Sequence, residues 1–452
     1  MSDFMRPLCK IAIPVTLQGM LQASFSIVDQ IMIGQLGEAG IAAVGLCSNF
    51  TLIFSVMSGA VGTVAGILIA QFLGAEEHTE AWRSLDVSLV CGGVLAALFL
   101  LTAGGFPAQV LGLYTADDAI LRVGAGYFRI VAFSYLPMAV STVLSAWLRC
   151  KEHAAVPFWA SFGAVAANTG LNYLLIFGKL GAPAMGVTGA AVATIIGQFC
   201  GCALAIYFNH KKNTDITLSV KGFRPDFRLI GEIYAIGLPS VIMIAIGSVM
   251  TFLMNKILIT YHAAHETAAT AFGAYFKLNS FIFMPVFGMN NGVVPIVAYN
   301  YGARNRKRMV ETIKRGALYA SIIMVFGTVL FWVIPGPLLK IFDATDTMLS
   351  VGIPALRIIS ISFCMAGACI ALGASFQALG RSLYSMITSI VRQLVFLIPI
   401  AYVLARYGAS VGNSDLVWWS YPIAEVFSLT LTLFFFRHLY KTVIAQLPEG
   451  RE

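Results

Sequence analysis

Two acidic residues, Asp29 and Glu425, lie deep inside long apolar segments of the sequence. A charged side chain at the centre of a bilayer costs about 2.5–3.5 kcal/mol on insertion scales, so an acid at that depth is expected to have a function. A carboxylate surrounded by neutral oxygens suits a hard monovalent cation or a proton. The two residues therefore point to cation chemistry inside a membrane.

Three neutral polar residues are predicted to lie at the same depth as Asp29. Asp29 and Asn172 each lie about five residues from the end of their apolar segments, and Asn168 is one turn deeper on the same helix face. Thr194 lies about eight residues into the next segment. We expect Asp29, Asn168, Asn172 and Thr194 to form a cation-binding site. Polar contacts that only hold the helices together are the alternative.

Glu425 is predicted to pair with a basic residue. Counted from the hairpin that joins their segments, Arg392 and Glu425 differ in depth by roughly 5 Å at a rise of 1.5 Å per residue. Two long side chains can bridge that gap, so we expect an ion pair. Lys277 is a third charge that we expect to be buried, and Gln198 is the approximate counterpart of Glu425 in the first half. We expect Gln198, Lys277, Arg392 and Glu425 to line a substrate cavity, with a purely structural salt-bridge cluster as the alternative.

Composition supplies the elements that must hold these residues. Hydrophobic residues make up 58% of the chain and charged residues only 11%, whereas soluble domains have about 25% charged residues. A bilayer crossing needs about 20 apolar residues in a helix. The sequence therefore predicts an all-α integral membrane protein with twelve transmembrane helices. The apolar segments are 10–34, 43–72, 86–112, 121–148, 154–177, 186–208, 233–261, 269–300, 314–341, 350–376, 384–405 and 415–437.

The basic residues indicate the orientation of the chain. With the N-terminus inside, the loops on that side hold 20 Lys and Arg residues and the opposite loops hold four. Because cytoplasmic loops of membrane proteins are enriched in Lys and Arg, we expect both termini to be cytoplasmic and the protein to lie in the plasma membrane. The net charge of +8 then needs no nucleic acid partner, and the lipid bilayer is the expected environment.

The second half of the chain repeats the first at an offset of 228 residues. The stretches 121–134 and 349–362 share six identical residues, beginning with Leu121 and Leu349. Six helices per repeat return the chain to the same side, so we expect two six-helix lobes related by a pseudo-two-fold axis along the membrane normal. The predicted N-lobe is 1–208, a cytoplasmic linker loop is 209–232, and the C-lobe is 233–452.

Several function classes are excluded by what the sequence lacks. We find no nucleotide-binding loop, no metal-ligand cluster and no nucleophile triad, and the six histidines lie in loops or at helix ends. We therefore expect no enzyme and no cofactor, apart from a coupling ion.

Four short motifs resemble those of a known transporter family. They are Ile27–Gly34 with Ala42–Gly45, Gly186–Thr194, Gly237–Pro239 and Phe376–Gly380. In this order they resemble the multidrug and toxic compound extrusion (MATE) family, over nearly the whole chain. The resemblance implies a Na⁺- or H⁺-coupled antiporter that exports organic, cationic drugs or toxic metabolites by alternating access between two lobes.

The resemblance also implies roles for individual residues. The similar subfamily places its cation site at the positions of Asp29, Asn168, Asn172 and Thr194. A common version has Asp where this chain has Asn172, so the site here carries one formal negative charge, which argues against a two-carboxylate proton mechanism. Another branch has acids in stretches that correspond to 242–251 and 364–374, and this chain has none there.

Two other functions remain open at this stage. A flippase for a lipid-linked saccharide, from a related transporter family, would fit the bases Lys256, Lys277 and Arg392. A receptor or scaffold that transports nothing is a third class, against which the internal repeat and the buried acid argue. For the transporter we expect small organic substrates and function as a monomer.

Overall fold

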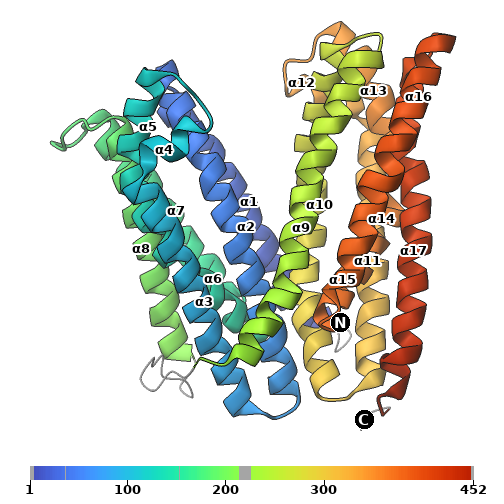
Figure 1. Ribbon diagram of the computed structural model, residues 1–452, viewed down its shortest axis with the longest axis horizontal. Helices are drawn as coiled ribbons and strands as arrows, with labels where there is room; N and C mark the ends of the chain where they lie inside the picture. Colours follow the sequence, from blue (N-terminus) through green and yellow to red (C-terminus); the bar gives the residue numbers. More distant parts are fainter. Residues whose placement is uncertain (1–4, 36, 152, 213–224, 449–452) are drawn as a thin grey trace. The chain divides into compact units, whose positions relative to one another are not determined.

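The computed structural model describes residues 5–35, 37–151, 153–212 and 225–448, and their regular structure is entirely helical (Figure 1). The chain divides into two compact units. The N-terminal unit is Ile13–Gly237, and the C-terminal unit is Leu238–Glu452 together with Met1–Ala12. The lobe boundaries at 208 and 233 stay a prediction, and residues 213–224 of the predicted linker lie outside the described residues.

The N-terminal unit contains six long helical crossings. Helices α5 and α6 continue one another through the short 3₁₀ turn η1 and form a single span, Asp118–Cys150. Helix α1 begins in the C-terminal unit and continues into this one. The elements are α1 (Met5–Gly34), α2 (Glu38–Gly74), α3 (His78–Gly105), α4 (Pro107–Gly112), α5 (Asp118–Val131), η1 (Ala132–Ser134), α6 (Tyr135–Cys150), α7 (Ala155–Phe177) and α8 (Val187–Lys212).

The C-terminal unit contains a series of elements that corresponds to that of the N-terminal unit. Helices α13 and α14 meet at a bend of 52° and together form one broken span. The elements are α9 (Phe227–Tyr261), α10 (Glu266–Gly302), α11 (Arg306–Val333), α12 (Pro335–Lys340), α13 (Asp346–Ser360), α14 (Phe363–Ala378), α15 (Ser382–Ile390), the π-helical segment η2 (Val391–Leu397), α16 (Ile398–Val411), η3 (Ser414–Trp419), α17 (Ser420–Thr442) and η4 (Ile444–Gln446).

The described helices account for the twelve predicted membrane crossings. Ten spans are long and apolar enough to cross a bilayer, and the bent pair α13–α14 is an eleventh. Helix α1, with 30 residues, exceeds the length of about 20 that a crossing needs. Large side chains exposed on the span surfaces are apolar, for example Leu101 and Phe326, as a lipid environment requires. The prediction of an all-α membrane fold is confirmed.

The predicted internal repeat is visible in the helix boundaries. Each α-helix from α2 to α6 has a counterpart whose first residue lies 228 positions further on, from Glu38 and Glu266 to Tyr135 and Phe363. The apolar segments 86–112 and 314–341, which we expected to be continuous, both break one residue before a proline, at Pro107 and Pro335. Proline disfavours the helical conformation of the residue before it, which explains the shared break.

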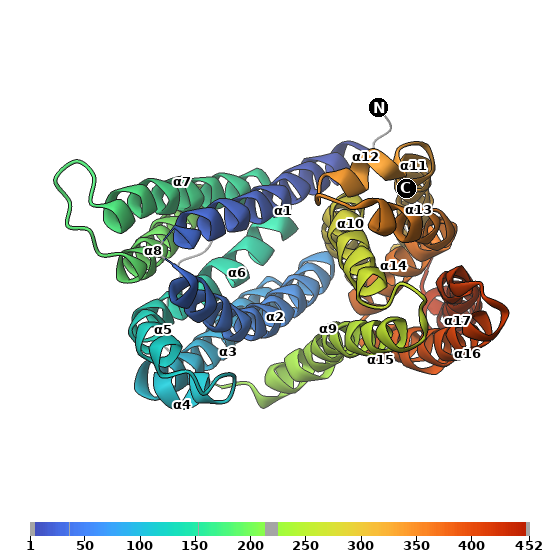
Figure 2. The same cartoon turned by 90° about the horizontal axis from the view of Figure 1, so that it is seen from above.

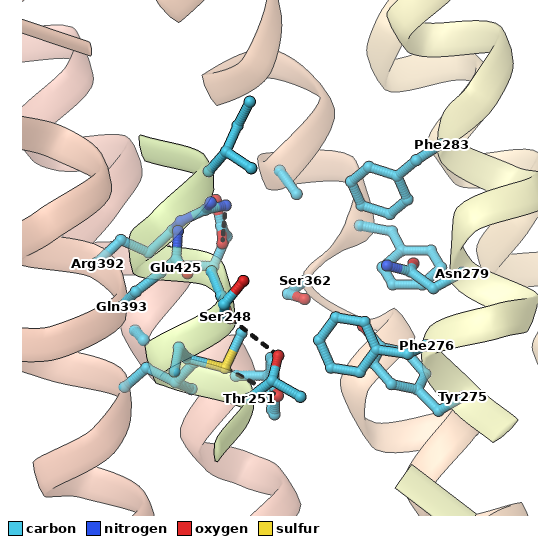
Figure 3. Close-up of a pocket in the computed structure, with 18 residues that line it drawn as sticks. Ser248, Thr251, Tyr275, Phe276, Asn279, Phe283, Ser362, Arg392, Gln393 and Glu425 are labelled. Atoms are coloured by element: carbon cyan, nitrogen blue, oxygen red, sulfur yellow. Dashed lines mark hydrogen bonds and ion pairs between the residues drawn. The ribbon is translucent and has the colours of Figure 1, made fainter. Parts of the chain in front are cut away.

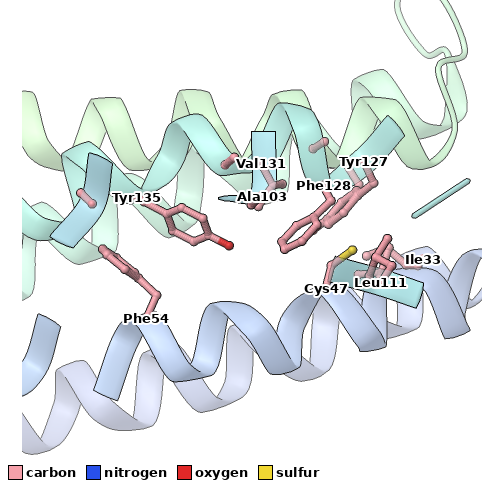
Figure 4. Close-up of a cluster of buried hydrophobic side chains, with 14 of the residues drawn as sticks. Ile33, Cys47, Phe54, Ala103, Leu111, Tyr127, Phe128, Val131 and Tyr135 are labelled. Atoms are coloured by element: carbon pink, nitrogen blue, oxygen red, sulfur yellow. The ribbon is translucent and has the colours of Figure 1, made fainter. Parts of the chain in front are cut away.

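An aromatic cluster packs the interior of the N-terminal unit (Figure 4). The rings of Phe54 and Tyr135 lie 4.6 Å apart between centres, and Phe50 meets Phe128 edge-on at 5.1 Å. The Tyr135 hydroxyl also lies 3.1 Å from Oγ1 of Thr51. These contacts hold the α5–η1–α6 span against α2 and thereby fix the position of α5.

Helices α7 and α8 lie side by side in the N-terminal unit (Figures 1 and 2). Glycines on α8 allow this close approach. A Cβ at Gly197 would lie 2.8 Å from Cβ of Asn168, and one at Gly189 would lie 2.6 Å from the carbonyl oxygen of Leu175. Small residues at such positions let the backbones of membrane helices pack tightly. The pairing brings polar side chains of α7 and α8 into reach of one another.

Candidate functional site

Four polar side chains form a continuous hydrogen-bonded chain across α1, α7 and α8 in the N-terminal unit. Nδ2 of Asn172 donates to Oδ1 of Asp29 over 2.6 Å and to Oδ1 of Asn168 over 2.8 Å. Nδ2 of Asn168 donates to Oγ1 of Thr194 over 3.2 Å, and that hydroxyl donates to the carbonyl of Ala190 over 2.9 Å. The structure therefore brings together all four residues that the sequence grouped.

Asn172 is the central member of this chain, and its side chain is only partly satisfied. The residue is fully buried, at 0% exposure, and both hydrogens of its amide are used. Its Oδ1 is buried and has no hydrogen-bond partner. A buried polar atom without a partner is costly, and in native proteins it calls for an explanation such as a bound ion. One carboxylate and several neutral oxygens thus lie together within the helix bundle.

Tyr127 on α5 belongs to this neighbourhood, although the sequence did not single it out. It is 7% exposed, and its hydroxyl is within hydrogen-bonding reach of Thr194. The hydroxyl is also close enough to Asp29 to interact with the charge of that carboxylate. Figure 4 shows its ring beside Phe128 in the aromatic cluster. In a sequence, a tyrosine among apolar residues is usually interpreted as a core packing residue. The contact between Tyr127 and Thr194 becomes evident only from the position of α5 against α8.

The C-terminal unit contains a cavity of about 400 Å³. Figure 3 shows Arg392, Gln393 and Glu425 on one side of it and Phe276, Asn279 and Phe283 on the other. The lining residues come from α9, α10, the α13–α14 junction, α14, η2 and α17. They are Ile244, Gly247, Ser248, Met250, Thr251, Tyr275, Phe276, Asn279, Phe283, Ser362, Phe363, Ala366, Arg392, Gln393, Leu397, Tyr421, Ala424 and Glu425.

The predicted ion pair between Arg392 and Glu425 is confirmed. Nη1 of Arg392 lies 3.5 Å from Oε2 of Glu425, whose side chain is 8% exposed, while the Arg392 side chain is 29% exposed. The second carboxylate oxygen, Oε1, is buried without a partner, and so is Oδ1 of Asn279 across the cavity. The pair therefore satisfies Glu425 on one oxygen only.

A π-helical segment places the basic member of this pair. Residues Val391–Leu397 follow the π-helix pattern between α15 and α16. The wider turn alters the direction of the side chains, and three residues of this short segment, Arg392, Gln393 and Leu397, line the cavity. Short π-helical segments inside α-helices are frequent at functional sites. Nothing in the sequence marks this segment, which depth counting treats as ordinary helix.

The structure does not bring Gln198 and Lys277 to this cavity. Gln198 belongs to the N-terminal unit, one turn beyond Thr194 on α8. Lys277 is exposed rather than buried as expected, and its ammonium nitrogen lies 5.7 Å from the centre of the Phe342 ring. It lies on α10 between cavity-lining residues, but it points to another side of the helix. Asn279, which the sequence does not single out, lines the cavity instead.

Comparisons with known proteins agree with this architecture. The MatE family model matches residues 14–174 and 239–403, once in each half. A probable multidrug resistance protein NorM of Thermotoga maritima is 25% identical over 446 residues, covering 96% of this chain and 92% of that protein. The multidrug export protein MepA of Staphylococcus haemolyticus is 25% identical over 437 residues, covering 96% and 93%.

Solved structures share the fold. A crystal structure of MATE in complex with MaL6 has a TM-score of 0.87 at 20% identity and covers 98% of both chains. An outward-facing conformation of a multidrug resistance MATE family transporter has a TM-score of 0.86 at 20% identity, covering 98% of this chain and 97% of that one. The family model, matching well over half of the chain, and the membrane fold lead to one conclusion: this chain belongs to the MatE family of multidrug efflux transporters, and it is a secondary transporter rather than an enzyme.

Proposed function

We propose that this chain is an antiporter that exports organic, cationic compounds in exchange for inward Na⁺ or H⁺. The observation that carries the proposal is the hydrogen-bonded chain of Asp29, Asn172, Asn168 and Thr194. It supplies one carboxylate, the unpaired Oδ1 of Asn172 and further neutral oxygens. Oxygen ligands of this kind suit a hard monovalent cation, and a buried carboxylate equally suits a proton.

The charge of the site gives the coupling its physical basis. Asp29 carries the one formal charge among these four side chains, so a single bound monovalent cation neutralises the group. A ligand shifts a conformational equilibrium only when it binds the two states with different affinity. The chain links α1, α7 and α8, so occupancy of the site alters the contacts that hold three helices together. In this proposal, ion binding at Asp29 biases the transporter between its inward- and outward-open states.

The same proposal includes the cellular arrangement. Both termini lie in the cytoplasm, in keeping with the excess of Lys and Arg in the loops on that side. The multi-span fold and the family place the protein in the plasma membrane. The transporter functions as a monomer in the bilayer, and its substrates are small organic compounds.

Ethidium accumulation in everted membrane vesicles tests the proposal, because export from the cell becomes uptake into such vesicles. A sodium gradient at clamped pH and a pH gradient without sodium are imposed separately. We expect ethidium uptake above that of vesicles without the protein under one of the two gradients, and its collapse when an ionophore dissipates that gradient. Uptake under neither gradient contradicts the proposal. Translocation of a lipid-linked saccharide by the same protein would favour the flippase instead.

A further inference from the structure

We propose that the cavity of the C-terminal unit binds a small aromatic zwitterion whose ammonium and carboxylate are attached to the same carbon, as in an aromatic α-amino acid. The binding itself stands on the geometry of the cavity. The further step, that such a zwitterion is an export substrate, rests on the proposed function.

Two unpaired acceptors belong to side chains that line the cavity. Glu425 is 6% exposed, and its Oε1 is buried without a partner. Oδ1 of Asn279, on the facing side of the cavity, is also buried and unpaired (Figure 3). A buried carboxylate oxygen and an amide oxygen both call for a hydrogen-bond donor. An ammonium group has three donors and a positive charge, so it suits either acceptor.

Arg392 offers the complementary donors. A guanidinium has five N–H donors in a planar fork, and the contact with Glu425 runs through Nη1 alone. The side chain is 29% exposed and lines the cavity. Such a fork binds a carboxylate through paired, charge-assisted hydrogen bonds. An anionic group in the cavity therefore has a partner within the same ion pair.

The pair disfavours ligands with a single charge in this cavity. A simple cation drawn to Glu425 meets the positive charge of Arg392, and a simple anion meets the reverse. The two charged groups lie only 3.5 Å apart, so a ligand that satisfies both must carry its own opposite charges side by side. A zwitterion with distant charges fails this requirement, whereas an α-amino acid head group meets it.

The remaining walls suit an aromatic body. Five aromatic rings line the cavity, those of Tyr275, Phe276, Phe283, Phe363 and Tyr421. Offset and edge-to-face contacts between rings add to the burial of apolar area. The volume of about 400 Å³ falls at the lower end of the range of roughly 300–1,000 Å³ for small-molecule sites. The cavity is thus sized for a compact ligand.

The helix pairing beside the cavity differs from its counterpart in the N-terminal unit. In the N-terminal unit, glycines on α8 such as Gly189 and Gly197 let α7 and α8 close on one another. Helix α17, in the corresponding place, contains no glycine, and its partner helix is interrupted by η2. Bulky residues and a charged pair thus occupy the helix pairing that is tightly closed in the N-terminal unit.

Equilibrium binding of radiolabelled L-phenylalanine to the purified full-length protein in lipid nanodiscs tests the inference. Competition by 2-phenylethylamine, which lacks the carboxylate, and by 3-phenylpropionate, which lacks the ammonium, measures the value of each charge. We expect saturable binding of L-phenylalanine, with each competitor weaker by about tenfold or more, since each loses a charge-assisted hydrogen bond. Absence of saturable binding overturns the inference. Equal or tighter binding of 2-phenylethylamine or 3-phenylpropionate also overturns it, because the cavity then prefers a plain cation or anion.

Variants locate the binding. Asn279→Ala and Glu425→Gln should each weaken L-phenylalanine binding by about tenfold. The exposed Asn291 on the same helix provides a matched control, and Asn291→Ala should bind normally. If Glu425→Gln does not fold, Asn279→Ala decides the question alone. Unchanged binding in Asn279→Ala contradicts the assignment. Because ethidium uptake is measured separately, the zwitterion site and the proposed export function fail independently.

Discussion

Nδ2 of Asn172 lies 2.6 Å from Oδ1 of Asp29, and this hydrogen bond joins α7 to α1. The same amide also bonds Asn168, which in turn bonds Thr194 on α8. The acid is thereby tied to a frame of neutral residues.

Replacing Asp29 with Asn should abolish gradient-driven ethidium uptake while leaving membrane expression near normal. The change removes the one formal charge of the site and keeps a side chain of the same size that can still accept from Asn172. Uptake in everted vesicles is compared with that of Asp86→Asn, an acid on α3 that does not belong to the hydrogen-bonded chain. Wild-type uptake against a gradient in Asp29→Asn would show that this residue does not couple transport.

Asn172→Ala should be more harmful than Thr194→Val. The first change removes both bonds of the central amide and interrupts the chain, whereas the second removes the bond at its end and a local bond to the carbonyl of Ala190. A buried partner left without its hydrogen bond costs roughly 1–3 kcal/mol. Thermal unfolding in detergent and ethidium uptake give the ranking, and equal losses in the two variants would argue against Asn172 as the centre.

Gly197→Ala should reduce ethidium uptake although it adds only one methyl group. The new Cβ would lie 2.8 Å from Cβ of Asn168 and 2.9 Å from the carbonyl oxygen of Ala164, so α7 and α8 must separate. Overpacking of this kind costs about 1–3 kcal/mol, and it also pulls Asn168 away from Thr194. Gly170 on α7 has open space around its Cβ position, and Gly170→Ala should remain active. Equal activity of the two variants would contradict the tight pairing.

Glu425→Gln and Arg392→Gln should each lower the thermal stability of the protein in detergent. Removing one member of a buried ion pair leaves the other charge uncompensated, which costs about 3–5 kcal/mol in soluble proteins. The double variant should recover part of the loss, because no charge remains unpaired. Additive single effects on the melting temperature would show that the pair contributes no coupling energy.

Recovery of transport then separates two roles for the pair. A purely structural pair predicts that the stabilised double variant regains uptake. A pair that contacts the ligand predicts that stability returns while transport of that ligand stays lost.

His262, in the turn between α9 and α10, should make stability depend on pH. It is 5% exposed, its Nδ1 accepts from the N–H of Ala264 over 3.1 Å, and its ring centre lies 6.0 Å from that of Trp418. Burial lowers the pKa of His262 below the ordinary 6.5, opposed by the charge of Asp415 and assisted by His265. The unfolded chain therefore takes up this proton at a higher pH than the folded protein does, and folding stability falls as the pH drops below about 6.5.

Melting temperatures measured from pH 7.5 to pH 5 check this expectation. The acid-side decline should be smaller in His262→Asn than in the wild type. His265→Asn is the control, because that residue is exposed and should leave most of the decline in place. An identical decline in His262→Asn and the wild type would assign the pH dependence to other groups.

Depth along a helix could be predicted from the sequence, but direction around it could not. Counting residues from segment ends placed Asp29 level with Asn172 and Arg392 within roughly 5 Å of the depth of Glu425, because every helix rises by the same amount per residue. Lys277 shows where counting fails. Lipid-facing and cavity-facing sides of α10 are both apolar, so the sequence does not reveal that Tyr275 and Asn279 line the cavity and Lys277 does not. Successive residues turn by about 100°, which takes Lys277 roughly 200° from Tyr275.

The π-helical segment was equally hidden from the sequence. Its residues, from Val391 to Leu397, have no glycine or proline to announce a change of helix type. The directions of the Arg392 and Gln393 side chains depend on that change. Which residues line the cavity therefore follows only from the three-dimensional structure. The ion pair could be anticipated because long side chains tolerate an error of one or two residues in the predicted depth. The residues on the facing wall of the cavity, such as Asn279, could not be anticipated in this way.

The constant separation of 228 residues, which holds from α2 to α6 and their counterparts, has an evolutionary consequence. A tandem gene duplication produces such a separation, and any later insertion or deletion within these elements would have changed it. Beyond Ala378 the two copies differ in length, since α7 ends at Phe177 and the counterpart of that residue would be 405, whereas α16 continues to Val411. The three crossings from α2 to α6 have therefore kept their spacing in both copies, while the last two crossings of the second copy diverged in length.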